Sequence, residues 1–393
     1  MSTTADARLA DSLERLGTET AFSVLARAGE LERAGASVIH LEIGEPDFDT
    51  PQHVRDAAWR AIEAGRTHYC PPAGIPELRE VAAEYLARSR GLEIPPGRVL
   101  VGTGAKPFLF FGILALANPG DEIVYPDPGF PIYESAIRFA GATPVPIALR
   151  EERDFAFDLD ELAAKLGPRT KLVILNSPHN PTGGVLAAHE IAGAAELIAQ
   201  TGAWVLSDEV YAQMVYEGSF ASIAGEPGML ERTILLDGCS KTFAMTGWRC
   251  GFAAVPEPLV DPLVRFFTNS TSCVPPFVQF GAIAALEGPM DEPAAMMDEF
   301  RRRRTLIVDG LRSLPGVSCR VPAGAFYAFP NVAGVPLPAP VLASRLLDEA
   351  GVALLAGTAF GEVGRENLRV SYANSQANLA EAIERMRGFI GGL

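Results

Sequence analysis

Between residues 95 and 285, short apolar runs alternate with stretches whose apolar positions recur at helical spacing. Such alternation is typical of βα units that build a mostly parallel sheet. We therefore predict an α/β fold with a mostly parallel, seven-stranded sheet. The predicted strands are Val99–Val101, Glu122–Tyr125, Thr143–Pro146, Leu172–Leu175, Trp204–Leu206, Thr233–Leu236 and Cys250–Ala254. The predicted helices are Pro107–Ala117, Pro131–Ala140, Leu159–Leu166 and Ala187–Gln200. Two prolines favour a sheet edge or a strand end for Thr143–Pro146.

After residue 285 the order of elements becomes that of a smaller α+β domain. A long charged helix is predicted over Pro293–Leu314, and a proline-rich loop over Val335–Pro340. The other predicted elements are strands at Val317–Val321, Phe326–Phe329, Val352–Leu355 and Leu368–Tyr372, and helices at Pro340–Ala350 and Ala377–Ile390. We expect a large domain over residues 46–285 and a small domain made of residues 1–45 and 286–393.

The composition narrows the class of protein. The 393 residues carry a formal net charge of −15 without a basic stretch to offset it, which argues against nucleic-acid and membrane-surface partners. The sequence has no apolar run of the roughly 18–20 residues that a spanning helix needs, and its polar N-terminus does not resemble a signal peptide. Five scattered cysteines argue against a disulfide framework. We therefore expect a cytoplasmic protein.

Polar and ionisable residues directly follow four of the predicted strands. They are Gly102–Lys106, Asn176–Gly184, Ser207–Tyr211 and Asp237–Lys241. Because ligands of open α/β sheets bind outside the carboxyl ends of the strands, these segments predict one site. The five histidines show no metal-ligand spacing, so no metal site is predicted.

Lysine is rare in this chain and one lysine stands at a strand end. The four lysines are Lys106, Lys165, Lys171 and Lys241, whereas the other 29 of the 33 basic residues are arginines. Lys241 follows its strand directly, in a small polar turn. Such a placement indicates a role that needs an amine, such as Schiff-base formation. A surface lysine is the alternative.

Six segments occur in an order that is typical of one enzyme family. They are Ile39–Pro51 (IHLEIGEPDFDTP), Pro128–Tyr133 (PGFPIY), Asn176–Gly183 (NSPHNPTG), Ser207–Tyr211 (SDEVY), Ser240–Gly251 (SKTFAMTGWRCG) and Asn367–Tyr372 (NLRVSY). They resemble the class I/II aminotransferases of fold type I, the aspartate aminotransferase kind, which depend on pyridoxal 5'-phosphate (PLP). The resemblance implies transfer of an amino group between an L-amino acid and a 2-oxo acid by a ping-pong mechanism. It also implies a homodimer with shared active sites, a large cofactor domain and a small mobile domain.

The resemblance implies catalytic roles for Lys241, Asp208 and Tyr211, and a binding role for Asn180. Lys241 would bind the cofactor as a Schiff base and then move a proton between the substrate Cα and the cofactor. Asp208 would pair with the pyridine nitrogen and keep it protonated, so that the ring withdraws electrons. Tyr211 and Asn180 would hydrogen-bond the oxygen at position 3' of the ring.

The phosphate of the cofactor would lie at a helix N-terminus. Gly104, Ala105 and Lys106 would offer backbone N–H groups there, where the helix dipole favours an anion. Ser240 and the bidentate guanidinium of Arg249 would complete the phosphate site.

Further residues would hold the ring and the substrate. Phe130 would stack on the pyridine ring, and Tyr69 would reach the phosphate of the neighbouring subunit. Arg369 would bind the substrate α-carboxylate, with help from Asn180 and the N–H of Gly44; an ion pair with a protein carboxylate is the alternative for this arginine.

Some features leave the substrate and the reaction open. Phe22, Ile43, Phe108 and Phe326 could line an apolar pocket or belong to the core, and Gly238 stands where the family has a serine. No second cation for a side-chain carboxylate is identified by motif. A β-lyase or a biosynthetic cyclase would share this fold and cofactor. The ligand-sensing half of a transcription regulator would need a DNA-binding domain, for which the chain leaves no place.

Overall fold

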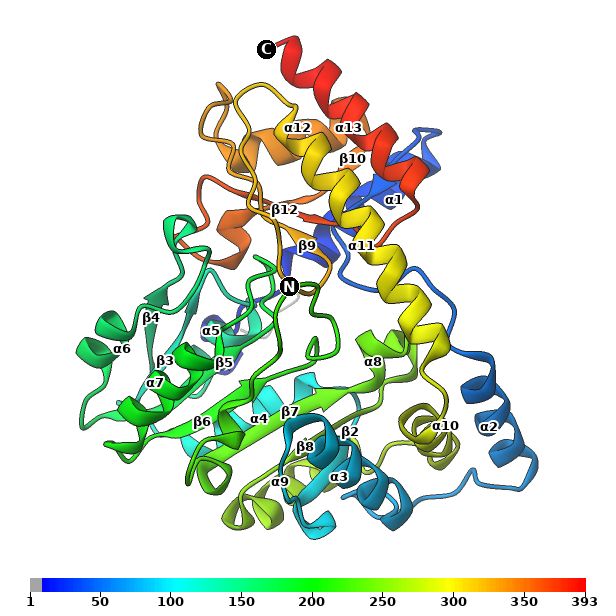
Figure 1. Cartoon of the computed structure of the whole chain (residues 1–393), viewed down its shortest axis with the longest axis vertical. Helices are drawn as coiled ribbons and strands as arrows, with labels where there is room; N and C mark the ends of the chain where they lie inside the picture. Colours follow the sequence, from blue (N-terminus) through cyan, green and yellow to red (C-terminus); the bar gives the residue numbers. More distant parts are fainter. Residues whose placement is uncertain (1–8) are drawn as a thin grey trace, which may run out of the picture.

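The computed structural model describes residues 9–393, which form two layered parts one above the other in Figure 1. The lower part is built on the predicted seven-stranded sheet, in the order β2-β8-β7-β6-β5-β3-β4. The strands are β2 (Val99–Gly102), β3 (Glu122–Asp127), β4 (Thr143–Ala148), β5 (Thr170–Asn176), β6 (Trp204–Asp208), β7 (Thr233–Gly238) and β8 (Gly251–Ala254). β8 is antiparallel to β2 and β7, and the other pairs are parallel.

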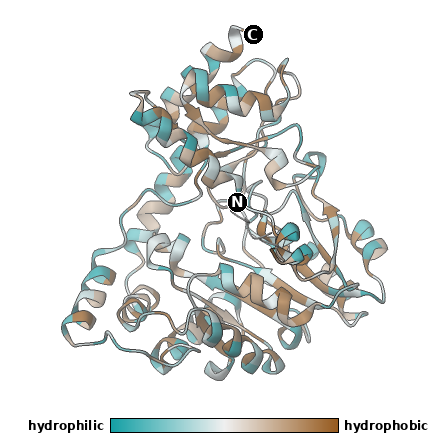
Figure 2. Ribbon diagram, turned by 180° about the vertical axis from the view of Figure 1, so that it is seen from behind, coloured by the Kyte–Doolittle hydropathy of each residue, from teal (hydrophilic) through white to brown (hydrophobic). Residues whose placement is uncertain are grey.

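The sheet is covered on both faces, which explains why its strands are continuous apolar runs. In β5, Leu172 and Ile174 pack with α4, α5 and α9, whereas Val173 and Leu175 pack on the opposite face with α6 and α7. Figure 2 shows these strands mostly in brown, with the polar positions on the helices. The helices are α4 (Lys106–Leu116), α5 (Ile132–Phe139), α6 (Leu159–Lys165), α7 (Ala188–Ala199) and α9 (Glu257–Ser270).

The predicted edge strand lies at the edge of the sheet. β4 pairs with β3 and has no second partner among the strands of residues 9–393. The N–H of Thr143 points to β3, where it donates to Asp121 O (2.8 Å). Pro144 and Pro146 therefore turn their missing N–H groups to the free side, because successive residues of a strand alternate in direction.

The remaining helices of the lower part cover the end of the sheet at β2 and β8. Buried side chains of α3 and α10 share one core cluster with Val101, Phe252 and Ala254 of the sheet. α2 packs against α10. These helices are α2 (Gln52–Glu63), α3 (Pro76–Arg90) and α10 (Pro276–Glu287).

The upper part contains two small sheets and four helices. β1 (Ile39–His40) pairs in parallel with β10 (Val352–Ala353). A three-stranded antiparallel sheet has the order β11-β12-β9, with β9 (Tyr327–Ala328), β11 (Leu355–Ala356) and β12 (Leu368–Ser371). The helices are α1 (Thr20–Arg33), α11 (Asp291–Arg312), α12 (Ala339–Ala350) and α13 (Gln376–Gly391). α11 is the long yellow helix in Figure 1 and contacts α13.

Three predictions for this part were wrong in detail. Val317–Val321 is not a strand, because its pairing is limited to a single bridge between Ser318 and Asn331. Val352–Leu355 is split into β10 and β11, which pair with different strands. The predicted loop Val335–Pro340 ends earlier, because proline is tolerated in the first turn of α12.

No helix within residues 9–393 is long and apolar enough to cross a membrane.

Candidate functional site

Four parallel strands bring the predicted polar segments to one edge of the large sheet. β2, β5, β6 and β7 end there with Gly102, Asn176, Asp208 and Gly238. In Figure 1 this edge lies between the lower and upper parts of the molecule. The two parts meet at this edge, where Lys241 contacts Gly44 and Arg369 contacts Asn180.

Lys241 lies on the short helix α8 (Cys239–Thr242), directly after β7. Its ammonium donates a hydrogen bond to the carbonyl oxygen of Gly44 and lies 5.8 Å from the ring centroid of Tyr211. Burial lowers the pKa of Lys241 to about 8, an effect that the charge of Glu45 opposes and that of Arg369 reinforces. A lowered pKa makes this amine a better nucleophile near neutral pH.

Asp208 ends β6, is buried, and lies close enough to Lys241 for its charge to act on the pKa of that amine. Its Oδ2 accepts a hydrogen bond from the hydroxyl of Tyr133 (2.7 Å). Its Oδ1 is also buried and has no hydrogen-bond partner within residues 9–393. Burial raises the pKa of Asp208 to about 6, although the Tyr133 hydroxyl and the backbone N–H of Val210 oppose the shift. A buried acceptor without a partner is costly unless a ligand supplies the donor.

Tyr133 has a place in this site that the sequence analysis did not assign. It belongs to the PGFPIY segment, and its ring is completely buried, so its hydroxyl needs a partner inside the protein. The signal in the sequence was the tyrosine that ends a matching segment.

Tyr211 contacts the upper part of the molecule through a second tyrosine that the sequence analysis missed. The hydroxyls of Tyr211 and Tyr327 lie 2.7 Å apart. Tyr327 comes from β9, and its hydroxyl also approaches the backbone of Gly44. A Cβ at Gly44 would lie 2.1 Å from that hydroxyl, so only glycine fits there. The chain around Gly44 is thus held against both tyrosine and lysine.

Arg369 lies in the middle of the small sheet, on β12, and is 4% exposed. Its Nη1 donates to Oδ1 of Asn180 (3.3 Å) and its Nη2 donates to the carbonyl oxygen of Glu42. Its guanidinium packs 4.7 Å from the Tyr327 ring centroid. Its Nε has no hydrogen-bond partner in the described part of the chain, and none of the ion pairs found there includes Arg369. Within residues 9–393, Arg369 therefore forms no ion pair with a protein carboxylate.

A tight glycine turn and an arginine shape the start of α4. Gly104 has a φ of 88°, and a Cβ there would lie 2.3 Å from Nη2 of Arg249. The same Nη2 donates to the carbonyl oxygen of Thr103 (3.3 Å). Gly104 N–H donates to Gly102 O (2.7 Å), whereas Ala105 and Lys106 stand at the helix start, where N–H groups lack intrahelical acceptors. This turn therefore combines backbone donors with a cation.

The other residues predicted to hold the cofactor differ in how near they lie to the residues described above. Ser240 lies next to Lys241 on α8. The Phe130 ring is 5.8 Å from that of Tyr133, and the ammonium of Lys106 lies 5.5 Å from the Phe130 centroid. Tyr69 is 90% exposed, so its side chain reaches into solvent rather than into the site of its own chain.

Two of the four residues considered for an apolar pocket belong to the core. Phe108 is completely buried against Phe267, and Phe326 is completely buried in the core of the upper part. Ile43 is half-buried, and Phe22 is 60% exposed on the first turn of α1. Phe326 nevertheless borders the candidate site, because its ring centroid lies 5.7 Å from the ammonium of Lys241.

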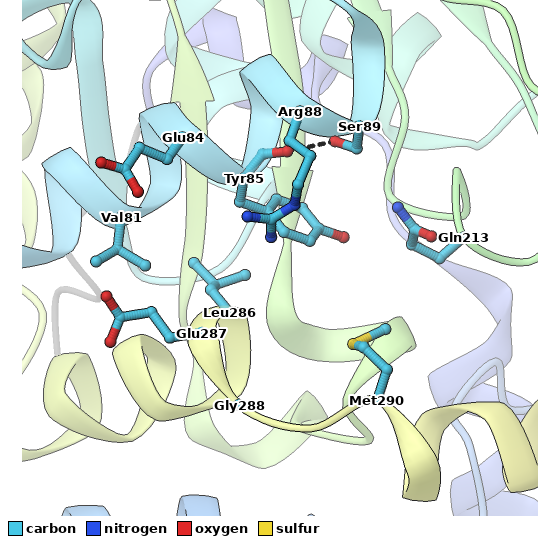
Figure 3. Close-up of a pocket in the computed structure, with 10 residues that line it drawn as sticks. All are labelled: Val81, Glu84, Tyr85, Arg88, Ser89, Gln213, Leu286, Glu287, Gly288 and Met290. Carbon is cyan, nitrogen blue, oxygen red and sulfur yellow. Dashed lines mark hydrogen bonds between the residues drawn. The ribbon is translucent and has the colours of Figure 1, made fainter.

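A cavity of about 480 Å³ lies elsewhere, between α3 and the end of α10. Figure 3 shows Glu84, Arg88 and Glu287 around it, together with Gln213 and Met290. It contains none of the residues described above and is therefore not the candidate site. Within residues 9–393, no group of three or more His, Cys, Asp or Glu side chains is placed to hold a metal ion.

Comparison with known proteins identifies the family. Residues 36–386 match the family described as aminotransferase class I and II. The chain is 40% identical to the aspartate/prephenate aminotransferase of Cereibacter sphaeroides, covering 98% of this chain and 99% of the relative. It is 37% identical to aromatic-amino-acid aminotransferase 2 of Thermococcus litoralis, covering 96% and 97%. The crystal structure of the Rhizobium meliloti aspartate aminotransferase superimposes with a TM-score of 0.92 at 37% identity, covering 98% of this chain and 99% of that one.

These matches confirm the expected fold, with a mostly parallel sheet of fold type I. The chain belongs to the class I and II aminotransferases. It is a transaminase, an enzyme that moves an amino group between an amino acid and a 2-oxo acid. Its relatives are named for different amino acids, so the family alone does not identify the substrate.

Proposed function

We propose that this transaminase holds PLP through Lys241 and exchanges an L-amino acid for a 2-oxo acid in two half-reactions at the same site. The observation that carries the proposal is the buried Oδ1 of Asp208, which has no partner within residues 9–393. A carboxylate oxygen kept dry near a lysine amine suits a protonated ring nitrogen. The residues present therefore fit this cofactor.

When bound, PLP supplies an aldehyde that condenses with amines and a protonated ring that withdraws electrons from the substrate Cα. Asp208 accepts the hydrogen bond of the ring nitrogen and is oriented by Tyr133, which occupies its other oxygen (2.7 Å). Tyr211 and Asn180 would hydrogen-bond the ring oxygen. Lys241 would hold the cofactor and, as a free amine with a lowered pKa, would take the proton from the substrate Cα.

Arg369 is the residue we assign to the substrate α-carboxylate. Its guanidinium is buried, its Nε lacks a partner within residues 9–393, and its other contacts are neutral oxygens. A planar guanidinium binds a carboxylate through two parallel hydrogen bonds. The N–H of Gly44 would add a third donor. Asn180 already accepts a hydrogen bond from Arg369 and thereby fixes its plane.

We assign the phosphate of the cofactor to the turn before α4. Ala105 and Lys106 would donate backbone N–H groups, and Arg249 would add charge beside Gly104, whose Cα leaves room for the guanidinium. Ser240 would donate its hydroxyl from α8. Phe130 would cover one face of the ring.

The visible absorption spectrum of the purified protein tests this proposal. A yellow band should be present or appear on adding PLP, it should bleach on adding the right amino acid, and it should return with a 2-oxo acid. Lys241→Ala should lack the band and the turnover. An active Lys241→Ala variant, or a protein that binds no PLP, would refute the assignment. A persistent band with release of ammonia would instead indicate a lyase.

We further propose a homodimer in which Tyr69 completes the site of the partner subunit. The observation that supports this is the 90% exposure of Tyr69, close in sequence to Trp59, which is 61% exposed on α2. Large exposed aromatic side chains are typical of interfaces. Mixing Tyr69→Ala with Lys241→Ala should form one intact site per hybrid dimer and restore tight PLP binding there. Unchanged binding in the mixture, with sedimentation as a monomer, would refute the dimer.

The domain division and the location are also proposals. We assign residues 46–285 to a large domain and residues 1–45 with 286–393 to a small one, of which residues 1–8 lie outside the described residues. The large sheet falls within the first range, and the small sheets fall within the second. A fall in the radius of gyration on substrate binding would show that the small domain closes on the large one.

We propose a cytoplasmic location because all five cysteines are free thiols, as in a reducing compartment. Fractionation of the source cells checks it.

A further inference from the structure

An ion pair between Glu19 and Lys106 joins the two parts of the molecule beside the candidate site. Glu19 immediately precedes α1, which packs on β10 and β11 of the upper part, whereas Lys106 begins α4 of the lower part. Oε1 of Glu19 accepts a hydrogen bond from the ammonium of Lys106. The carboxylate is more covered than the ammonium, with side chains 16% and 42% exposed. The roles proposed above use the backbone of Lys106 but not its side chain.

The pair lies within reach of the groups that would hold the cofactor and the substrate. The ammonium of Lys106 is 5.5 Å from the centroid of Phe130, the ring we assign to the cofactor. The charge of Glu19 acts to raise the pKa of both Arg369 and Tyr327. Glu19 therefore lies close enough to influence a substrate held by Arg369.

Lys106 is a cation that a second substrate carboxylate could use. Its ammonium lies 5.5 Å from the Phe130 centroid and has no ligand among the roles proposed above, whereas Arg369 and Arg249, whose charges act on Lys241, both have one. A substrate side chain with a carboxylate would have to displace Glu19 from Lys106 and then lie beside the displaced carboxylate. Like charges at such a partly buried site repel each other. An uncharged side chain leaves the ion pair intact.

We propose that Glu19 is a specificity residue that neutralises Lys106 and thereby directs the enzyme to amino acids with uncharged side chains. This inference rests on the proposed function, because it assumes that Arg369 holds the α-carboxylate. It makes the chain selective against dicarboxylic amino acids by occupying the cation that would bind them.

The first test compares amino donors on the PLP-loaded enzyme. The rate at which each donor bleaches the visible band gives kcat/KM without a second substrate. The wild type should prefer L-phenylalanine and L-methionine to L-aspartate and L-glutamate by at least tenfold. Glu19→Gln should raise the values for the two dicarboxylic donors about tenfold, a change of about 1.4 kcal/mol, and should alter the neutral donors by less than about twofold.

Two variants control for charge and for the role of Lys106. Glu30→Gln removes a paired carboxylate from α1, the helix that Glu19 precedes, since Oε2 of Glu30 lies 3.2 Å from Nη1 of Arg27, and it should leave the donor ratio unchanged. The double variant Glu19→Gln, Lys106→Met should lose the gain for dicarboxylic donors, because the released cation is then absent. A wild type that prefers L-aspartate, or a Glu19→Gln variant with an unchanged ratio, would overturn the proposal.

A binding measurement separates this inference from the proposed function. Calorimetry with succinate and 3-phenylpropanoate needs no turnover. The wild type should bind 3-phenylpropanoate more tightly, and Glu19→Gln should gain about tenfold for succinate. If no amino acid changes the visible band, the proposed function is wrong. If the succinate affinity of Glu19→Gln is unchanged, only the specificity role of Glu19 is wrong. If Glu19→Gln does not fold, Lys106→Met provides the test. This variant should bind succinate more weakly than the wild type does, and tighter binding would refute the proposal.

Discussion

Asp208→Asn is expected to damage catalysis and at the same time to stabilise the protein without its cofactor. Asparagine keeps the shape of the side chain and an oxygen that can accept the Tyr133 hydroxyl bond (2.7 Å), but it removes the charge. In the wild type that charge is buried with one oxygen, Oδ1, lacking a partner within residues 9–393. The folded apoprotein therefore contains a carboxylate that is less stable than it is in water.

The size of the effect follows from the pKa of Asp208, which burial raises from 3.8 to about 6. A shift of about two units corresponds to roughly 3 kcal/mol, at about 1.4 kcal/mol per unit. The sign follows from proton linkage: the folded state binds the proton more tightly than the unfolded state. The destabilisation is therefore complete above about pH 6 and disappears as the pH falls from 6 to 3.8.

Thermal unfolding of the apoprotein at several pH values measures this effect. At pH 8, Asp208→Asn should melt a few degrees above the wild type, and the difference should shrink towards zero near pH 4. Asp261→Asn, an exposed carboxylate on α9, is the control and should change the melting temperature little at either pH. A variant that melts below the wild type at pH 8, or a gap independent of pH, would refute the reasoning.

Adding the cofactor should reverse the order of the melting temperatures of the wild type and Asp208→Asn. Adding PLP supplies the donor that Asp208 lacks, so PLP should raise the melting temperature of the wild type more than that of Asp208→Asn. The variant should lose most of its turnover, because a neutral amide does not keep the ring nitrogen protonated. Near-normal turnover would contradict the role proposed for Asp208.

Three further predictions concern the substrate, the lysine and the fold. Arg369→Ala should raise KM for both substrates by about ten- to a hundredfold through loss of a charged contact of roughly 1.5–3 kcal/mol; steady-state kinetics with an unchanged KM would move the carboxylate site elsewhere. The rate at which the apoenzyme captures PLP should rise as the pH passes about 8, because the pKa of Lys241 is lowered to that value and only the neutral amine reacts; stopped-flow rates that rise only near pH 10.5 would contradict this. Arg90→Met should destabilise the protein by roughly 3–5 kcal/mol in urea unfolding, since it leaves Glu209 (3.0 Å) and Asp237 (2.6 Å) as unpaired buried charges. Arg88→Met, on the exposed side of α3, should have little effect, and equal losses in both variants would refute this account.

Local pattern predicted most of the large sheet. Seven apolar runs became its seven strands, and the two prolines of β4 placed that strand at the edge. The prediction was less successful in the upper part, where β1, β9, β10 and β11 each contain two residues. Strands of that length are defined by their partners rather than by their own side chains, so the sequence had little signal for their ends.

The sequence by itself determined which chemical groups reach the edge of the sheet. Parallel strands end together, so residues that follow them, such as Asp208 and Lys241, meet because of the chain direction alone. The segments that match the family added Arg369, although its surroundings depended on the fold.

The tertiary structure decided how these groups are paired. Tyr133 bonds Asp208 across 75 residues of sequence, Tyr327 bonds Tyr211 across 116, and Glu19 bonds Lys106 across 87. Partners so distant leave no periodic trace in the sequence. The pKa of a side chain depends on burial and on such neighbours, and the free oxygen of Asp208 could not be known before its surroundings were fixed. The sequence therefore determined the class of chemistry, and the packing of the two parts decided the electrostatics that direct it.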